Sequence, residues 1–264
     1  MEPSPWADVG FVLCDLDGVV WLARRPIQGS VRAIERLRAS GRRVVFVTNN
    51  SMSVVADQEA ALAAIGIPAN GDVVTSAQAG ASLLAPGETV LVCGAAGLDE
   101  AVAARGATVV RDGPADAVIV GLDHDFDYWR LRAASAAIRG GARFIATNDD
   151  PSFPTPTGQT PGAGALVAAV ATASGVDPVI AGKPYGPMAG LVAERCGPDF
   201  RAERAVVVGD RPSTDGRFAQ SVGCAFALVR TGVTPAGADP EAEIAVALDV
   251  ADLAAVVEHI LQQR

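Results

Sequence analysis

Short apolar runs alternate along this chain with Ala-, Leu- and Arg-rich amphipathic stretches, and no other feature limits the fold as strongly. We expect the runs to be strands, at 11–14, 44–47, 90–93, 118–120, 143–146, 179–180, 205–208 and 225–229. We expect helices in the stretches between them, among them 30–40, 54–65, 164–174 and 250–262. Strands that alternate with helices build βαβ units around a parallel sheet. The sequence therefore predicts an α/β protein.

The βα pattern starts afresh near residue 80, after a segment at 73–76 that we interpret as a connection. A second, turn-rich segment follows at 149–164. Together they predict an inserted α/β unit of about 100 residues, which is a common domain size. We place the inserted unit at 81–180, and we assign 1–80 and 181–264 to a single core.

Composition excludes several classes of partner. The net charge is −9, so we expect no nucleic-acid partner, because phosphate backbones bind basic faces. No apolar run approaches membrane-spanning length and the first residues are unlike a signal peptide, so we expect no membrane partner and a cytoplasmic location. The scattered cysteines, which follow or interrupt apolar runs, are expected to be buried free thiols: Cys14, Cys93, Cys196 and Cys224.

Two aspartates follow the first expected strand. Asp15 and Asp17 stand two residues apart, so in an extended chain their side chains share a face and can meet one ligand. Two close carboxylates repel each other unless a cation or a shared proton relieves them. An aspartate pair before a glycine, here Gly18, is also a plain turn signal. On this motif alone a ligand site and a simple turn are equally supported.

A polar cluster, Thr48-Asn49-Asn50-Ser51, follows the second expected strand. A hydroxyl and exposed backbone N–H groups ahead of a helix can hold anionic oxygens. Taken alone, such a cluster is more often an ordinary helix cap. It therefore supports an anion site only in combination with other motifs.

Lys183 is the only lysine among the 21 Lys and Arg residues. Its compact ammonium with three donors suits a point-charge contact to a phosphate or a carboxylate, which a planar guanidinium makes differently. The position lies in a loop before an expected helix, where a solvated surface lysine is equally ordinary. A lone lysine is therefore a weak indication by itself.

Another acidic motif, Gly209-Asp210-Arg211, follows the strand expected at 205–208, and Asp215 comes shortly after it. Glycine lets the backbone approach a ligand, and open α/β sheets bind ligands at the carboxyl ends of their strands. We therefore expect Asp210 to point into a crevice beside Asp15 and Asp17. These three residues form a hard oxygen set that suits Mg²⁺ rather than zinc.

The four motifs, in this order and each after an expected strand, resemble those of the haloacid dehalogenase superfamily of aspartate-dependent phosphatases. The inserted unit resembles the α/β cap of its type IIA branch, which holds NagD-like, p-nitrophenyl-phosphate, phosphoglycolate and glycerol-phosphate phosphatases. Three segments carry that second resemblance: Gly121-Leu122-Asp123, Ala146-Thr147-Asn148-Asp149 and Pro161-Gly162-Ala163-Gly164. The resemblance implies a Rossmann-like parallel sheet core with an inserted α/β cap domain.

It also implies a Mg²⁺-dependent phosphatase, a phosphoric monoester hydrolase that acts on a small phosphorylated metabolite through an aspartyl-phosphate. Glycerol 3-phosphate and phosphoglycolate are the substrates it suggests. Asp15 would be the nucleophile, and Asp17 would serve first as general acid and then as general base. The carboxylates of Asp15 and Asp210 and the backbone carbonyl of Asp17 would bind Mg²⁺, with Asp215 behind them.

The same resemblance assigns the phosphate oxygens to Thr48, the backbone of Asn49, and Lys183. It allows a homodimer formed through the cap. Two alternatives stay open at this point, namely other phosphotransfer chemistry of the superfamily, such as a mutase, and a non-catalytic nucleotide-binding protein. Asp17 argues against the second alternative, because a protein that only binds has no need of an acid–base residue.

The sequence leaves the substrate unspecified. Asp149, Asp150 and Arg211 lie beside the motifs, and their part in specificity is open.

Overall fold

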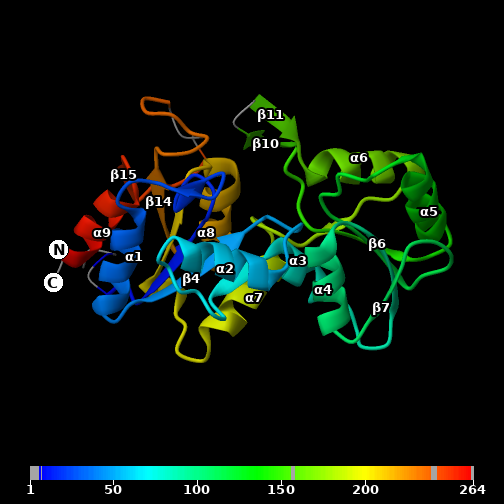
Figure 1. Cartoon of the computed structure of the whole chain (residues 1–264), viewed down its shortest axis with the longest axis horizontal. Coiled ribbons are helices and arrows are strands. Elements are labelled where there is room, and N and C mark those ends of the chain that lie inside the picture. The colour runs from blue at the N-terminus through cyan, green and yellow to red at the C-terminus, as the bar shows by residue number, and fades with distance from the viewer. Residues whose placement is uncertain (1–5, 7, 156–157, 239–242, 263–264) are drawn as a thin grey trace. The chain divides into compact units, whose positions relative to one another are not determined.

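The computed structural model describes residues 6, 8–155, 158–238 and 243–262. The chain forms two compact units, each with its own sheet (Figure 1). The first unit comprises Met1–Thr48, Glu59–Val74 and Ala189–Arg264, and the second comprises Asn49–Gln58 and Thr75–Met188. The core and cap boundaries expected from the sequence stay a prediction.

Six strands form the main sheet of the first unit, in the order β15-β14-β13-β1-β4-β5. Their bounds are β1 (Phe11–Cys14), β4 (Arg43–Thr48), β5 (Val73–Thr75), β13 (Ala205–Gly209), β14 (Ala225–Val229) and β15 (Leu248–Val250). β1 runs parallel to both neighbours, with Cys14 opposite Val208 on one side and Phe46 on the other. β1 and β13 are buried along their whole length, as their unbroken apolar sequences require.

The strand order reverses between β1 and β13. From β1 the sheet continues outward to β4 and β5, whereas on the other side β13 is followed by β14 and β15. Connections diverge at such a switch point, and open α/β sheets bind their ligands there, beyond the carboxyl ends of the strands. A ligand site in the first unit is therefore expected in the loops that follow β1 and β13.

Helices of the first unit cover this sheet. They are α1 (Ser30–Ala39), α8 (Arg217–Val222), α9 (Leu253–Gln262), the 3-10 helix η1 (Ala202–Arg204) and the π-helix η2 (Pro212–Gly216). α1 and α9 pack side by side (Figure 1), and Arg36 forms an ion pair with Glu258 between them. A small hairpin of β2 (Trp21–Leu22) and β3 (Arg25–Pro26) connects β1 to α1. α2 (Val55–Ala64) and α7 (Gly186–Cys196) contain residues of both units.

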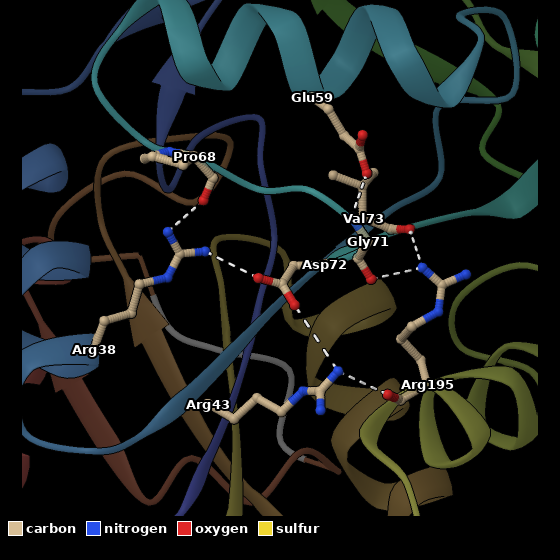
Figure 2. Close-up of polar contacts among 8 residues, drawn as sticks. All are labelled: Arg38, Arg43, Glu59, Pro68, Gly71, Asp72, Val73 and Arg195. Carbon is tan, nitrogen blue, oxygen red and sulfur yellow. Dashed lines mark hydrogen bonds and ion pairs between the residues drawn. The ribbon is translucent and has the colours of Figure 1, made fainter.

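Three arginines fasten the segment that leads into the edge strand β5 (Figure 2). Asp72 accepts a hydrogen bond of 3.1 Å from Arg38 and pairs with Arg43 at 3.9 Å. Arg195 donates to the carbonyls of Gly71 at 2.8 Å and Val73 at 3.2 Å. These long-range contacts stabilise a strand that lies at the edge of the sheet, as far as the structure describes the chain.

Five strands form the sheet of the second unit, in the order β12-β9-β8-β6-β7. They are β6 (Thr89–Cys93), β7 (Thr108–Val110), β8 (Ala117–Val120), β9 (Arg143–Ala146) and β12 (Val179–Ile180). Helices α3 (Ser76–Ala81), α4 (Ala96–Ala104), α5 (Tyr128–Arg139) and α6 (Ala163–Ser174) accompany them. Side chains alternate along β6, so Val90 and Val92 join one apolar cluster while Leu91 and Cys93 join another.

The structure confirms the α/β fold class and most of the expected elements. The helix expected at 250–262 begins at Leu253, because Val250 ends the strand β15. Two further segments are corrected. Residues 73–75, expected as a connection, form the strand β5, because three residues are too few to show a strand's periodicity. The turn-rich segment at 149–164 contains an antiparallel hairpin of β10 (Ser152–Thr155) and β11 (Gly158–Pro161). No helix in the described part of the chain is both long and apolar enough to cross a membrane.

The cysteines are free thiols, as expected. Cys14, Cys93 and Cys196 are buried, and Cys224 is partly buried. Burial raises the pKa of Cys93 to about 12 and that of Cys196 to about 11, because a thiolate is poorly solvated in an apolar interior. The thiols of Cys93 and Cys196 are therefore protonated and unreactive at neutral pH.

Candidate active site

Three carboxylates gather at the switch point of the first unit. Asp15 follows β1, Asp210 follows β13, and Asp215 lies in η2. One oxygen from each carboxylate lies within 4.8 Å of the others. We call these three residues the acidic cluster. Asp210 and Asp215 are buried and Asp15 is partly buried, so their mutual repulsion is poorly screened.

Strand pairing brings the first two carboxylates together. The N–H of Asp15 donates to the carbonyl of Val208 at 2.9 Å, which extends the β1–β13 ladder by one residue. Gly209 ends β13, and Asp210 comes next. The register of two buried parallel strands therefore fixes Asp15 beside the turn that carries Asp210.

Glycines pack tightly against the acidic cluster. A Cβ atom on Gly232 would lie 1.8 Å from Oδ2 of Asp210, and one on Gly209 would lie 2.2 Å from Cβ of Asp215. Gly18 has a φ of +85°, a conformation that L side chains rarely adopt, and its Cβ would also meet Asp210. Any side chain at these positions would displace a carboxylate.

Backbone N–H groups orient two of the carboxylates. Asp215 accepts a hydrogen bond from the N–H of Arg211 at 3.1 Å, and its own N–H donates to the Arg211 carbonyl at 2.7 Å. The N–H of Val233 donates to Asp210 Oδ2. These bonds fix the direction in which both carboxylates face.

The donor set fits Mg²⁺. Carboxylate oxygens are the ligands that Mg²⁺ prefers in proteins, and three of them within this distance of one another match a small hard cation. That Asp215 lies behind the metal ligands stays a prediction; its carboxylate oxygen lies within the same 4.8 Å as those of the other two. Among the described residues, this is the group of acidic, histidine or cysteine side chains that could hold an ion.

The loop after Asp15 is held in a tight turn by its own backbone hydrogen bonds. The carbonyl of Leu16 accepts N–H groups from Val20 at 2.9 Å and Trp21 at 3.1 Å. Ser30 is the first residue of α1, and its hydroxyl donates to the Val20 carbonyl at 2.8 Å. Asp17 lies within this loop with an exposed side chain, outside the acidic cluster. An exposed carboxyl can exchange protons with a ligand and with water.

The predicted phosphate ligands are divided between the units. Thr48 ends β4 in the first unit and is buried. Asn49 and Lys183 belong to the second unit, where they contact each other. The side chain of Asn49 accepts from the Lys183 N–H at 2.8 Å and donates to the Lys183 carbonyl at 3.1 Å. Lys183 is 3% exposed, so it is not the ordinary surface lysine that its loop position also allowed.

Some features of the site had no signal in the sequence. The Gly-, Pro- and Ala-rich composition of residues 232–240 predicts a surface loop, and Val233 is indeed exposed, but nothing in that composition indicates the contacts that Gly232 and Val233 make with Asp210. Residues 239 and 240 of that loop lie outside the described residues. We assigned the backbone of Asn49 to phosphate, and the contacts of its side chain were missed.

Two family profiles match the chain. Residues 12–108 match the haloacid dehalogenase-like hydrolase family, and residues 180–256 match a HAD-hydrolase-like family. The acidic cluster divides between these two matches, with Asp15 in the first and Asp210 and Asp215 in the second.

Curated relatives cover most of the chain. It is 43% identical over 233 residues to D-glycerol 3-phosphate phosphatase of Mycobacterium tuberculosis, an alignment that spans 85% of this chain and 64% of that protein. It is 37% identical over 226 residues to an acid sugar phosphatase of Staphylococcus saprophyticus, spanning 84% of this chain and 86% of the relative.

Solved structures agree in fold. The mycobacterial glycerol phosphate phosphatase in complex with magnesium superposes with a TM-score of 0.85 at 39% identity, covering 96% of this chain and 78% of that one. A 4-nitrophenylphosphatase from Thermotoga maritima superposes with a TM-score of 0.89 at 28% identity, covering 97% of this chain and 99% of that one. With the acidic cluster at the switch point, these likenesses show that the chain belongs to the haloacid dehalogenase-like hydrolases.

Proposed function

We propose that this protein is a Mg²⁺-dependent phosphatase that hydrolyses a small phosphorylated metabolite through an aspartyl-phosphate. The acidic cluster at the switch point supports this proposal most directly. The relatives add support, because both curated proteins are named phosphatases and the mycobacterial one has been solved with magnesium and with calcium.

Two carboxylates divide the chemistry. A carboxylate oxygen of Asp15 attacks phosphorus, and the bond from phosphorus to the ester oxygen breaks. Asp17 gives its proton to that departing oxygen, so an alcohol leaves rather than an alkoxide. Asp17 then takes a proton from water as the water attacks the aspartyl-phosphate, which releases inorganic phosphate and restores Asp15. Its exposed position in the loop suits both transfers.

Positive charge is needed to bring an anionic ester to an anionic cluster. Asp15, Asp210 and the Asp17 carbonyl, with Asp215 behind them, would hold Mg²⁺, which would offset charge on the nucleophile and the phosphoryl group. Lys183 adds a second positive charge, and Thr48 and the Asn49 backbone donate to the phosphate oxygens. The chain otherwise has a net charge of −9, so the binding charge must be local.

Glycerol 3-phosphate is the substrate we place first, because the 43% identical relative is named for it. Sugar phosphates come next, from the name of the staphylococcal relative, and phosphoglycolate follows from the sequence resemblance. We also propose that residues 81–180 act as the inserted cap, that the protein works in the cytoplasm, and that any homodimer forms through the cap.

A phosphate-release assay tests the proposal. The protein is given p-nitrophenyl phosphate, glycerol 3-phosphate, sugar phosphates and phosphoglycolate, each with Mg²⁺ and with excess EDTA. We expect Mg²⁺-dependent release from the aryl ester and a preference for one metabolite. Phosphate transfer to a second hydroxyl instead of water would favour a mutase. Nucleotide binding without release from any ester would favour a non-catalytic binding protein, and either result would overturn the proposal.

A further inference from the structure

The side chain of Asn49 pairs with both backbone groups of Lys183. Its Oδ1 accepts the Lys183 N–H at 2.8 Å, and its Nδ2 donates to the Lys183 carbonyl at 3.1 Å. The pair is 134 residues apart in the chain and lies within the second unit. A carboxamide that satisfies both main-chain groups of one residue fixes the position and direction of that residue's Cα–Cβ bond.

The loop around Lys183 leaves little room for another arrangement. A Cβ atom on Gly182 would lie 2.4 Å from the Thr147 carbonyl and 2.6 Å from Asn49 Oδ1. Ala181 is fully buried, and its N–H donates to the Ala146 carbonyl at 2.9 Å. The residues before Lys183 are therefore packed directly against Asn49 and the end of β9.

The backbone of Asn49 is itself held in place. Its carbonyl accepts the Ser76 hydroxyl at 2.7 Å and the Asn148 amide at 3.0 Å. Ser76 and Asn148 are both buried. Asn49 is thus fixed by its main chain and has its side chain available to hold Lys183.

Asp150 determines which way the carboxamide faces. Nδ2 of Asn49 also donates to Asp150 Oδ2 at 2.9 Å. A carboxylate only accepts hydrogen bonds, so it requires the NH₂ end of the amide on its side. The oxygen is then left to meet the Lys183 N–H. With the amide reversed, its NH₂ group would face that N–H, donor against donor.

We propose that Asn49 is a positioning residue for Lys183, and that Asp150 orients the Asn49 carboxamide for this task. The kinetic consequence rests on the proposed function, in which the Lys183 ammonium offsets phosphoryl charge. A displacement of about 1 Å in such a group can cost about 10²-fold in rate. The structural part, that Asn49 fixes Lys183, holds whatever ester the protein uses.

The lone lysine makes the structural part directly measurable. Protein labelled with ¹³C-lysine gives a single ε-carbon NMR signal, because the chain contains one lysine. We expect Asn49→Ala to move this signal towards that of free lysine and to weaken its response to inorganic phosphate with Mg²⁺. Asn50→Ala is the matched control, since Asn50 Oδ1 accepts the N–H groups of Met52 and Ser53 instead. An unmoved signal in Asn49→Ala, or an equal shift in both variants, would overturn the inference.

A double-mutant cycle on kcat gives the kinetic test. We expect Asn49→Ala to lower kcat about 10- to 100-fold, the usual effect of removing a group that orients a ligand-binding residue. In a Lys183→Ala background, Asn49→Ala should lower kcat almost no further, since the lysine that Asn49 positions is gone. Additive losses would contradict the inference while leaving the proposed function intact. A parent protein without turnover would instead remove the proposed function, and the NMR comparison would still decide whether Asn49 fixes Lys183.

Asn49→Asp provides a variant that keeps the shape of the side chain. Aspartate keeps the acceptor for the Lys183 N–H but sets a carboxylate against Asp150. Adding Asp150→Asn returns a donor to this contact. The double variant should therefore regain part of the parent's kcat, and its lysine signal should move part of the way back to the parent position. A double variant no better than Asn49→Asp alone would contradict the role given to Asp150.

Discussion

The acidic cluster of the first unit and the Lys183 loop of the second hold charged groups by different means. Around Asp210 and Asp215, glycines let the backbone approach so closely that a Cβ would come within 1.8 to 2.2 Å of the carboxylate side chains. Around Lys183, one side-chain amide makes hydrogen bonds of 2.8 and 3.1 Å to the main chain. The first arrangement depends on the absence of side chains, and the second on a particular one.

This difference has a consequence for mutational sensitivity. Close backbone packing is disturbed by any added atom, so the acidic cluster should tolerate almost no change at Gly209 or Gly232. A side-chain amide can be replaced by another group of matching polarity, so the Lys183 loop should lose function in graded steps.

Asp15→Asn should abolish turnover while leaving the fold unchanged. The amide nearly matches the carboxylate in shape but cannot accept the phosphoryl group. Loss of a nucleophile of this kind costs several powers of ten, so kcat for p-nitrophenyl phosphate should fall more than about 10³-fold. The thermal midpoint serves as the control for folding. Activity above about a thousandth of the parent would make a covalent role for Asp15 untenable.

Asp17→Asn should separate substrates by their leaving groups. A nitrophenolate leaves with little protonation, whereas the alkoxide of glycerol 3-phosphate needs a proton. The variant should lose about 10²- to 10⁴-fold on the alkyl ester and much less on the aryl ester. Parallel kcat/KM measurements on both esters decide this. Equal loss would remove Asp17 from the acid role or show that breakdown of the phospho-enzyme limits both reactions.

Lys183→Arg tests whether the Lys183 loop needs a compact cation. The guanidinium is longer, flat and forked, so it cannot place its charge where the ammonium stood. We expect a loss of about 10²- to 10³-fold in kcat, close to the effect of removing a placed transition-state donor. Near-parent turnover would mean that any cation suffices, and that the single lysine is an accident of composition.

Gly232→Ala should disturb the acidic cluster through one methyl group. Its Cβ would lie 1.8 Å from Asp210 Oδ2, so the carboxylate must move. Mg²⁺ affinity, measured by calorimetry, should fall about 10- to 100-fold, as when groups that orient metal ligands are removed. Unchanged Mg²⁺ affinity would show that the loop yields, and that close packing is not what fixes Asp210.

Gly190→Ala is the matched control for that substitution and has the smallest expected effect. Gly190 lies in α7, where an added Cβ meets nothing within 4 Å. Alanine should raise the stability to unfolding by about 0.4–1 kcal/mol, because it narrows the unfolded ensemble and favours the helix. Denaturant titration measures this change, and Mg²⁺ affinity should be unaltered.

Strand ends could be predicted from the sequence, and with them the meeting of Asp15 and Asp210 in the acidic cluster. The expected strand at 11–14 agrees with β1, and that at 205–208 agrees with β13 except for Gly209. Once two parallel strands are placed as neighbours, the residues that follow them must meet, so Asp15 and Asp210 could be paired without coordinates. Local spacing was sufficient here because the sheet supplies the long-range geometry.

The contacts of Asn49 could not be predicted in this way. They join residues 134 and 101 positions apart, and they depend on how loops of the second unit pack, which no periodicity encodes. Gly232 is a similar case. The Gly-, Pro- and Ala-rich composition of residues 232–240 indicates a surface loop, and only the folded chain shows that Gly232 contacts Asp210. Sequence patterns locate the reacting groups, whereas the groups that hold them emerge from tertiary packing.

Trapping the phospho-enzyme tests the central claim most directly. The protein is mixed with p-nitrophenyl phosphate and Mg²⁺, quenched in acid within milliseconds, digested and examined by mass spectrometry. We predict one phosphoryl group on the peptide that contains Asp15, formed before steady state, absent when EDTA replaces Mg²⁺ and absent from Asp15→Asn. Release of p-nitrophenol with no label on Asp15 at any quench time, or label on another residue, would contradict the account.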